Sequence, residues 1–214
     1  MIYVHHLEKS RSNRIVWLLE ESGAEYQVVF YQRDPKTSGA PDTLKKVYPL
    51  GVSPVITDGE VTVAESGAII EYILDHYDPE QRFRPVSGQA LLDYRYWMHF
   101  AEGSLMPLLV MQLILSKSRK RVPFFIRPVI GKFIDALCQN FILPRLKPQL
   151  QLIDDFLARN HWFAGEQMSG ADFQMFLALQ LAEIQTDISA FSHIQRYMQE
   201  VKALPGYQRA EKQF

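Results

Sequence analysis

The segment PLGVSPVITDGEVTVAESGAII, residues 49–70, decides the fold of the amino-terminal part of the chain. Two short runs rich in β-branched residues, 55–57 and 60–63, flank the dipeptide Asp58-Gly59, which is typical of a type I′ hairpin turn. Ser66 then precedes apolar residues at helical spacing and is expected to be the N-cap of a helix. The segment therefore predicts a β-hairpin followed directly by a helix.

Two dipeptides in this segment suggest a binding site. Pro54 opens the first hairpin strand, where a trans proline would only remove a hydrogen-bond donor, so we expect a cis Ser53-Pro54 bond that leaves the Ser53 backbone free to pair with an extended peptide. Alternatively, Pro54 only protects a strand edge. Glu65 and Ser66 stand at a helix start, where N–H groups bind a carboxylate and the Glu65 carboxylate can bind an ammonium. Together they fit an amino-acid head group.

This combination closely resembles the glutathione-binding half of the glutathione S-transferase family. The resemblance implies that Ser53 and Pro54 hold the cysteinyl part of glutathione, while Glu65 and Ser66 hold its γ-glutamyl end. Val52 belongs to the same expected binding segment, although it replaces a polar side chain. The partner of the glycyl carboxylate stays open, with Arg33 and Lys36 within loop reach; Lys36 is our candidate.

The loop between the first strand and the first helix contains the candidate catalytic hydroxyl. In serine-type members of the family, the serine that stabilises the thiolate lies four residues before an arginine, and Ser10 precedes Arg14 by this spacing. Ser12 is the runner-up and the expected helix N-cap. Both serines could instead be helix caps and nothing more. The loop contains no cysteine, which argues against the cysteine-type branch of the family.

The elements expected in the first part follow the order βαβαββα, which is compatible with a thioredoxin-like domain over residues 1–80. Besides the hairpin and its helix, we expect strands over 2–5 and 25–31 and helices over 13–22 and 42–47.

Residues 78–88 form a polar, proline-containing segment, which indicates a linker between independently packed halves. The second part, 88–214, is expected to be an all-helical domain. We expect a long helix over 89–116 with a kink at Pro107, a helical region over 133–160, and shorter helices over 173–184, 195–202 and 204–211. Ser169 and Asp172 have the spacing of a capping box.

Two further strings, HHLEKSRSNRIVWLLEE and FAEGSLMPLL, extend the resemblance to small fungal and bacterial transferases of this family. The cleft between the two halves would then bind a hydrophobic electrophile, lined by Phe100, Met106 and Met111. Glu102 in the same helix could reach the amino group of glutathione across a dimer interface.

Composition restricts the class of protein. The chain has 214 residues and a net charge of −1, so nucleic acid is not an expected partner. Neither a signal peptide nor an apolar run of the ~18 residues of a membrane span is evident, which favours a cytoplasmic protein. The basic run 116–121 is expected to be a solvated helix end, and interfacial membrane contact by 122–134 remains an alternative.

Other residues that could carry chemistry have simpler interpretations. The single cysteine, Cys138, is expected to be a small core residue. His5 and His6 lack a third ligand at suitable spacing, so no metal cofactor is expected.

The resemblance implies a homodimeric glutathione S-transferase that takes part in detoxification. Its thiolate would attack electrophilic carbon, and it could also reduce hydroperoxides. Two alternatives stay open. One is a non-catalytic glutathione-binding or scaffolding protein, and the other is a glutathione-dependent isomerase or dehalogenase.

Overall fold

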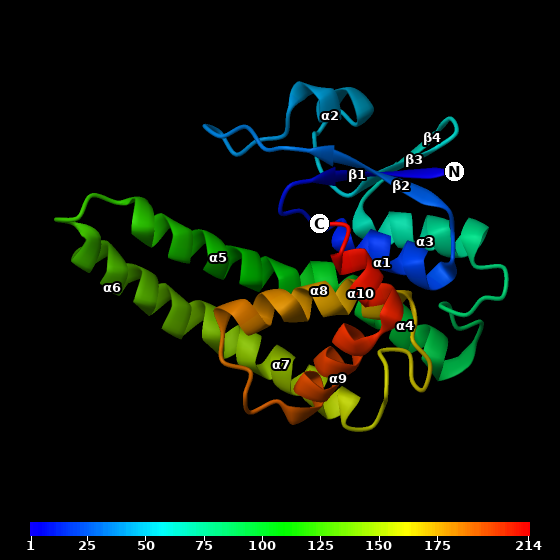
Figure 1. The fold of residues 1–214 in the computed structure, drawn as a ribbon. Coiled ribbons are helices and arrows are strands. Elements are labelled where there is room, and N and C mark those ends of the chain that lie inside the picture. The colour runs from blue at the N-terminus through cyan, green and yellow to red at the C-terminus, as the bar shows by residue number, and fades with distance from the viewer.

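A computed structural model describes residues 1–214, apart from the side chain of Lys120 (Figure 1). The strands and helices, in chain order, are β1 Ile2–Leu7, α1 Asn13–Ser22, β2 Tyr26–Tyr31, α2 Asp42–Val47, β3 Val55–Asp58, β4 Val61–Ala64, α3 Ser66–Tyr77, α4 Gly88–Phe100, α5 Met106–Arg121, α6 Arg127–Leu137, α7 Leu143–Leu157, α8 Gly170–Gln185, α9 Ser192–Ala203 and α10 Pro205–Glu211. Five-residue π-helical segments, Ala101–Leu105 and Cys138–Ile142, join α4 to α5 and α6 to α7.

The four strands form one mixed sheet in the order β2-β1-β3-β4. Strand β1 pairs with β2 in parallel and with β3 antiparallel, and β3 and β4 form the hairpin. This confirms the predicted βαβαββα order and the fold class, a thioredoxin-like domain followed by helices (Figure 1). Strand β1 continues two residues beyond the prediction, because His6 and Leu7 still pair with β2.

The hairpin is present, but its predicted turn is shifted by one residue. Asp58 is the last residue of β3 and pairs with Val61, so the two turn residues are Gly59 and Glu60. Only Gly59 has a positive φ, of 59°, which is typical of a type II′ turn rather than type I′. Asp58 stays in the strand because its carboxylate accepts hydrogen bonds from the Tyr72 and Tyr77 hydroxyl groups of α3. The local sequence does not reveal these contacts.

The helix boundaries follow the predictions closely, with one correction at a cap. Helix α1 ends where Gly23 adopts a left-handed φ of 73°, as expected of a helix C-terminus. Ser66 is the first residue of α3 instead of its N-cap; the N-cap position belongs to Glu65, whose side chain makes no capping hydrogen bond. The Ser169–Asp172 capping box at α8 is confirmed.

The first long helix widens where a kink was predicted. Helices α4 and α5 run on through the π-helical segment, and Pro107 is the second residue of α5. Proline donates no backbone N–H and its ring would clash with the carbonyl four residues earlier, so the turn before Pro107 widens. The same arrangement precedes Pro144 at the start of α7. The second helical region also begins earlier than predicted, at Arg127.

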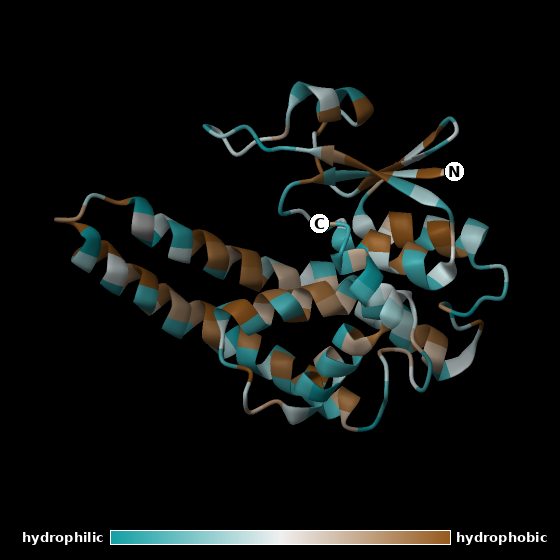
Figure 2. Cartoon of the chain, in the orientation of Figure 1, coloured by the Kyte–Doolittle hydropathy of each residue, from teal (hydrophilic) through white to brown (hydrophobic). Residues whose placement is uncertain are grey.

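The two halves share one hydrophobic core, contrary to the predicted independent packing. Apolar residues from the sheet, from α1 and α3, and from the helices of the second half form a single buried cluster (Figure 2). Trp17 of α1 is 1% exposed and contacts the rings of Phe173, Phe176 and Tyr207. Trp17 therefore lies at the contact between the halves.

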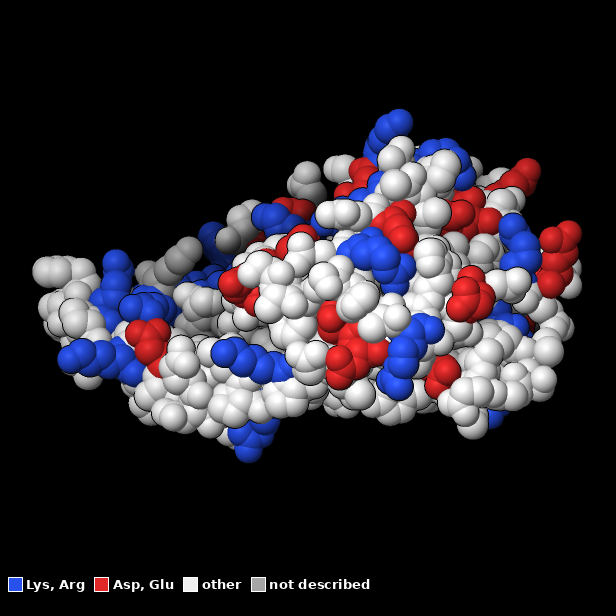
Figure 3. All heavy atoms as spheres, turned by 90° about the horizontal axis from the view of Figure 1, so that it is seen from below, with Lys and Arg blue, Asp and Glu red and all other residues white. Residues whose placement is uncertain are grey.

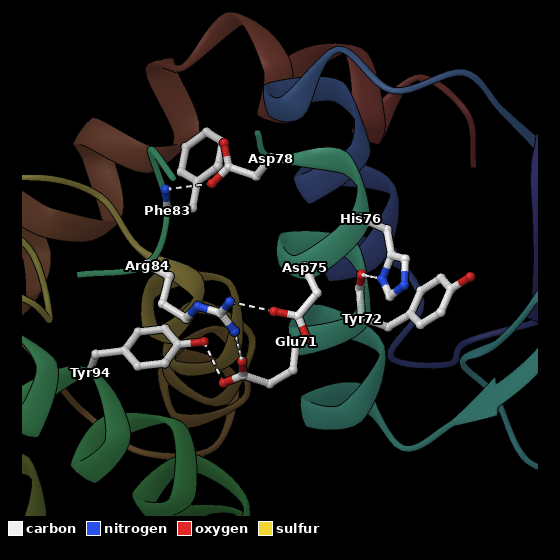
Figure 4. Close-up of polar contacts among 8 residues, drawn as sticks. All are labelled: Glu71, Tyr72, Asp75, His76, Asp78, Phe83, Arg84 and Tyr94. Atoms are coloured by element: carbon white, nitrogen blue, oxygen red, sulfur yellow. Dashed lines mark hydrogen bonds and ion pairs between the residues drawn. The ribbon is translucent and has the colours of Figure 1, made fainter. Parts of the chain in front are cut away.

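The segment from 78 to 87 contains no helix or strand, as predicted, yet it is attached to both halves (Figure 4). Arg84 binds Glu71 at 2.7 Å and also binds Asp75, both on α3, and the Tyr94 hydroxyl of α4 donates to Glu71 at 2.6 Å. The Phe83 carbonyl accepts from the Gly170 N–H at 2.8 Å. These bonds fix the angle between α3 and the helical domain.

Gly170 allows a close approach at this junction. A Cβ atom added there would lie 2.9 Å from Ile70 Cγ2 and 2.9 Å from Tyr94 Cε2. Only a residue without a side chain therefore lets α8 begin against α3 and α4.

Among the described residues, one helical stretch, Gly88–Arg119, is long and apolar enough, by length and composition, to cross a bilayer. This stretch contains isolated polar residues, so it is not an uninterrupted apolar run of the kind sought in the sequence. Its most apolar window nevertheless has a mean hydropathy of 1.4. Its residues Trp97, Ala101 and Leu105 belong to the shared core. Cys138 packs against the same core and is partly buried.

Candidate active site

A chain of short hydrogen bonds connects the loop before α1 with the start of β3. The Ser10 hydroxyl lies 3.0 Å from Ser53 Oγ and 3.2 Å from Ser12 Oγ. Ser12 Oγ lies 2.5 Å from His6 Nδ1, and the Ser53 hydroxyl donates to the His5 carbonyl at 2.8 Å. Three hydroxyl groups and one imidazole therefore form a continuous polar chain.

The direction of these bonds follows from counting protons. A carbonyl oxygen can only accept, so Ser53 spends its single proton on His5, and Ser10 must donate to Ser53. Ser12 must then donate to Ser10, and the Nδ1–H of His6 must donate to Ser12. The Ser10 hydroxyl can turn toward a ligand at the cost of its bond to Ser53 alone, and Ser10 also lines a hollow.

The two candidate serines differ in accessibility. Ser10 is partly exposed and lines a pocket, whereas Ser12 is 0% exposed. Ser12 occupies the N-cap position of α1 as predicted, but its side chain makes no capping hydrogen bond because it binds His6 instead. Burial lowers the pKa of the His6 imidazole, so His6 is neutral near pH 7.

The Ser53-Pro54 bond is cis, as predicted. The antiparallel register pairs Val55 with Ala64, so the residues just outside the hairpin, Pro54 and Glu65, lie at the same end of it. Glu65 is exposed and has a φ of 72°, a conformation that non-glycine residues adopt mainly at functional sites. The sheet therefore brings the two predicted binding dipeptides together, and Ser53 connects them to Ser10.

Behind this site, a buried arginine joins the two halves. The Arg14 side chain is 1% exposed and donates to Glu102 at 2.7 Å and to Gln174 of α8. Burial lowers the pKa of Arg14 to about 10 despite the attraction of Glu102, so Arg14 remains charged at neutral pH. Its Nε and Nη2 atoms are buried without a partner among the described residues. A buried guanidinium with unpaired nitrogens is costly, so the burial of Arg14 depends on its ion pair with the Glu102 carboxylate.

Glu102 contacts the loop before α1 of its own chain. Its second carboxylate oxygen accepts from Arg11 at 2.5 Å, so one carboxylate bridges Arg11 and Arg14. The predicted contact of Glu102 with glutathione of a partner subunit would have to share this carboxylate with two arginines. The π-helical segment, which carries Glu102, therefore positions the loop that contains Ser10.

A hollow of about 400 Å³ opens beside Ser10, between the loop, α5 and α8. Its lining residues are Lys9, Ser10, Arg11, Met106, Val110, Leu113, Leu177, Gln180, Leu181 and Ile184. Of the three residues predicted for the electrophile, Met106 lies here. Phe100 lines a separate hollow with Tyr96 and His99. Met111 is 41% exposed and lines neither hollow, because it lies five residues from Met106 and therefore on another face of α5.

A second, polar hollow of about 800 Å³ lies on the other side of Lys9. Arg33 and Lys117 are among its lining residues, whereas the predicted Lys36 is not. Arg33 donates to the carbonyls of Glu8 and Ser38, which orients its guanidinium toward this hollow's rim. Val52, at 36% exposed, stands beside the cis bond.

Sequence reasoning missed the functional setting of several residues. The predicted first strand ended at His5, so the contact of His6 with Ser12 was not expected. The contact of Gln174 with Arg14 was not expected either, because these residues are 160 positions apart in the chain. The residues of α8 that line the apolar hollow carry only a helical pattern in the sequence. No group of three potential metal ligands occurs among the described side chains.

Comparison with known proteins identifies the family. Residues 1–75 match the family described as glutathione S-transferase, N-terminal domain, and residues 119–205 match glutathione S-transferase, C-terminal domain. Glutathione S-transferase 3 of Schizosaccharomyces pombe is 36% identical over 206 residues, which cover 96% of this chain and 84% of that protein. Glutathione S-transferase 1 of Saccharomyces cerevisiae is 34% identical, covering 85% and 81%.

Solved structures agree in fold. A glutathione S-transferase from Actinobacillus pleuropneumoniae is 32% identical and superposes with a TM-score of 0.79, covering 100% of this chain and 92% of that one. A glutathione transferase homologue from Lodderomyces elongisporus, solved with two glutathione molecules per subunit, has a TM-score of 0.76 at 22% identity, covering 98% and 96%. With both domains matched and relatives above 30% identity across most of its length, this chain belongs to the glutathione S-transferase family.

Proposed function

We propose that this glutathione S-transferase uses Ser10 to stabilise the thiolate of bound glutathione, which then attacks an electrophile held in the apolar hollow. Transferase activity follows from the family, and nothing in the fold or among the relatives favours the non-catalytic alternative. The observation that carries the proposal is the hydroxyl chain, in which the partly exposed Ser10 lines the apolar hollow and can turn its proton toward a ligand while losing only its bond to Ser53.

In this proposal, glutathione lies extended beside the hairpin. The backbone at Ser53 pairs with the cysteinyl residue, and Glu65 and Ser66 at the start of α3 hold the α-ammonium and α-carboxylate of the γ-glutamyl end. Val52 and Pro54 flank the peptide. We keep Lys36 as a candidate for the glycyl carboxylate, but Arg33 is the better one because it lines the polar hollow.

The chemical task is to ionise the thiol near neutral pH, because the thiolate is the nucleophile. When glutathione binds, its thiol proton passes to solvent and the Ser10 O–H turns from Ser53 to donate a hydrogen bond to the thiolate sulfur, while Ser12 continues to donate to Ser10. A charge-assisted hydrogen bond contributes about 1.5–3 kcal/mol, which corresponds to a thiol pKa lower by about one to two units. His6 acts as a positioning residue, because its Nδ1–H holds Ser12 in the orientation that supports Ser10.

The reaction itself is a displacement. With an aryl halide, the thiolate sulfur forms a bond to the ring carbon and the halide leaves with the bonding electrons. The hollow beside Ser10 is lined by Met106, Val110 and Leu113, whose apolar side chains suit a hydrophobic electrophile. The same thiolate could reduce a hydroperoxide to an alcohol, with a second glutathione completing the disulfide. It could also serve an isomerase or dehalogenase activity, which differs in its substrate.

We further infer a homodimer that works in the cytoplasm in detoxification. The support is the family resemblance, because members of this family usually form dimers with two-fold symmetry. Sedimentation of the purified protein measures directly whether it is a dimer.

Calorimetric titration with glutathione, followed by an assay with glutathione and an aryl halide, tests the function. The wild-type protein is expected to bind and turn over. Ser66→Ala is expected to weaken binding by about tenfold through the loss of one hydrogen bond. Binding without turnover on any electrophile tested would support the non-catalytic alternative, and no heat of binding would refute the site.

A further inference from the structure

The paired ends of α5 and α6 extend well beyond the rest of the molecule (Figure 1). We call residues 117–133 the helical tip. It contains the last turn of α5, the connecting segment and most of α6. Figure 2 shows that the outermost connection is hydrophobic, which is unusual for a solvent-facing turn.

The tip exposes large apolar side chains that lie outside the hydrophobic core of the chain. Phe124 is 81% exposed and Phe125 is 70% exposed, and their rings touch only edge to face. Ile126, Val129 and Phe133, at 38%, 70% and 62%, follow at a spacing that places them on one face of a helix. Soluble monomers rarely leave such a continuous apolar surface uncovered, so this face indicates a binding partner.

The sequence that forms this face carries a positive charge. From Gly103 to Ile134 the sequence contains six lysine and arginine residues and no acidic residue, so this stretch carries +6 while the rest of the chain carries −7. Basic side chains gather at this end of the molecule when it is viewed from below (Figure 3). Arg119 pairs with Asp135 at 2.8 Å, the first acidic residue beyond the stretch. Two of the other five cations, Arg127 and Lys132, are exposed on α6 and flank the apolar face at helical spacing.

We propose that the helical tip docks on an anionic membrane surface, with its phenylalanine rings in the interface and its cations against the lipid headgroups. An amphipathic segment with aromatic residues on one face and Lys and Arg beside them is the pattern of interfacial binding. The complementary charge favours this occupant over a two-fold contact between the tips of two copies of the chain, each of which carries a like charge of +6.

Docking of the tip would place the active site close to the bilayer. Helix α5 runs from the apolar hollow, which it lines through Val110 and Leu113, to the tip. Electrophiles dissolved in lipid could therefore enter the hollow without crossing bulk water. The docking itself depends only on the tip and does not require the proposed catalytic role of Ser10.

Co-sedimentation of the full chain with vesicles tests the proposal. We expect binding to vesicles of phosphatidylcholine mixed with phosphatidylserine, weaker binding to phosphatidylcholine alone, and loss of binding as ionic strength rises. The double variant Phe124→Ser, Phe125→Ser should lower the partition coefficient by at least about tenfold, since two aromatic side chains no longer insert. Lys132→Glu should lower it by roughly fivefold or more.

Two matched variants control for nonspecific effects. Val86→Ser removes another exposed apolar side chain, which is 73% exposed, and Lys212→Glu reverses an exposed charge near the carboxyl terminus. Neither should change vesicle binding, and all variants should keep the wild-type rate with a water-soluble electrophile. Equal binding by tip and control variants would overturn the proposal. So would a tip variant that dissociates a self-assembled species without affecting vesicle binding, because the tip would then be a contact between copies.

Discussion

Replacing Ser10 by alanine tests the catalytic hydroxyl with little damage to the fold. Ser53 keeps its bonds to the His5 carbonyl and the Leu7 N–H, and Ser12 keeps its bond to His6. The buried Ser12 hydroxyl loses Ser10 as its acceptor, but it can donate to His6 Nδ1 when the imidazole proton moves to Nε2, so it is not left without a partner. We therefore expect the free energy of unfolding to fall by no more than about 1 kcal/mol.

The effect on chemistry should be much larger than the effect on stability. Loss of a charge-assisted hydrogen bond of about 1.5–3 kcal/mol raises the pKa of bound glutathione by about one to two units. Below that pKa, kcat/KM is proportional to the thiolate fraction, so it should fall by roughly 10- to 100-fold near neutral pH. The loss should shrink as pH rises, because hydroxide then removes the proton that Ser10 no longer stabilises.

The assay is the pH profile of kcat/KM with an aryl halide, together with the ultraviolet absorbance of the bound thiolate. Ser12→Ala is the matched control: it removes a hydroxyl two residues away that is fully buried. This control should cost about 1–3 kcal/mol of stability, because it leaves the buried His6 donor unpaired, and it should shift the thiol pKa less than Ser10→Ala. An unchanged profile in Ser10→Ala beside a shifted one in Ser12→Ala would refute the assignment and make Ser12 the thiolate donor.

Three further predictions concern the junction of the halves and the buried histidine. Glu102→Ala leaves the Arg14 guanidinium buried without its carboxylate, so it should lower the free energy of unfolding by about 3 kcal/mol in urea titrations and reduce turnover by loosening the Ser10 loop. Gly170→Ala should cost about 1–3 kcal/mol through overpacking, whereas Gly103→Ala, where an added Cβ meets nothing within 4 Å, should cost much less; equal effects would contradict the close approach. Burial lowers the pKa of His6, so below about pH 6.5 the unfolded chain binds a proton at this residue that the folded chain does not. The free energy of unfolding should therefore fall from pH 7 to pH 5. It should fall less steeply in His6→Phe, which lacks the titrating group.

The sequence alone determined the elements whose causes are local. Gly23 ends α1 because glycine adopts a left-handed φ at no steric cost, and the Ser169–Asp172 box starts α8 because its two side chains satisfy backbone donors within one turn. The cis bond before Pro54 and the hairpin followed from the same kind of short-range reasoning. These signals, together with the family resemblance, were sufficient for the fold and its class of activity.

The tertiary structure decided whatever depends on residues far apart in the chain. The hairpin turn begins at Gly59 because tyrosines of α3 bind Asp58, and Trp17 is buried because α8 covers it. Phe100 faces away from the hollow that Met106 lines, which only the packing of α4 and α5 reveals. A local pattern specifies where a helix begins and ends, but contacts between distant segments set its rotation and its partners, and these contacts place His6 behind Ser12 and Ser10.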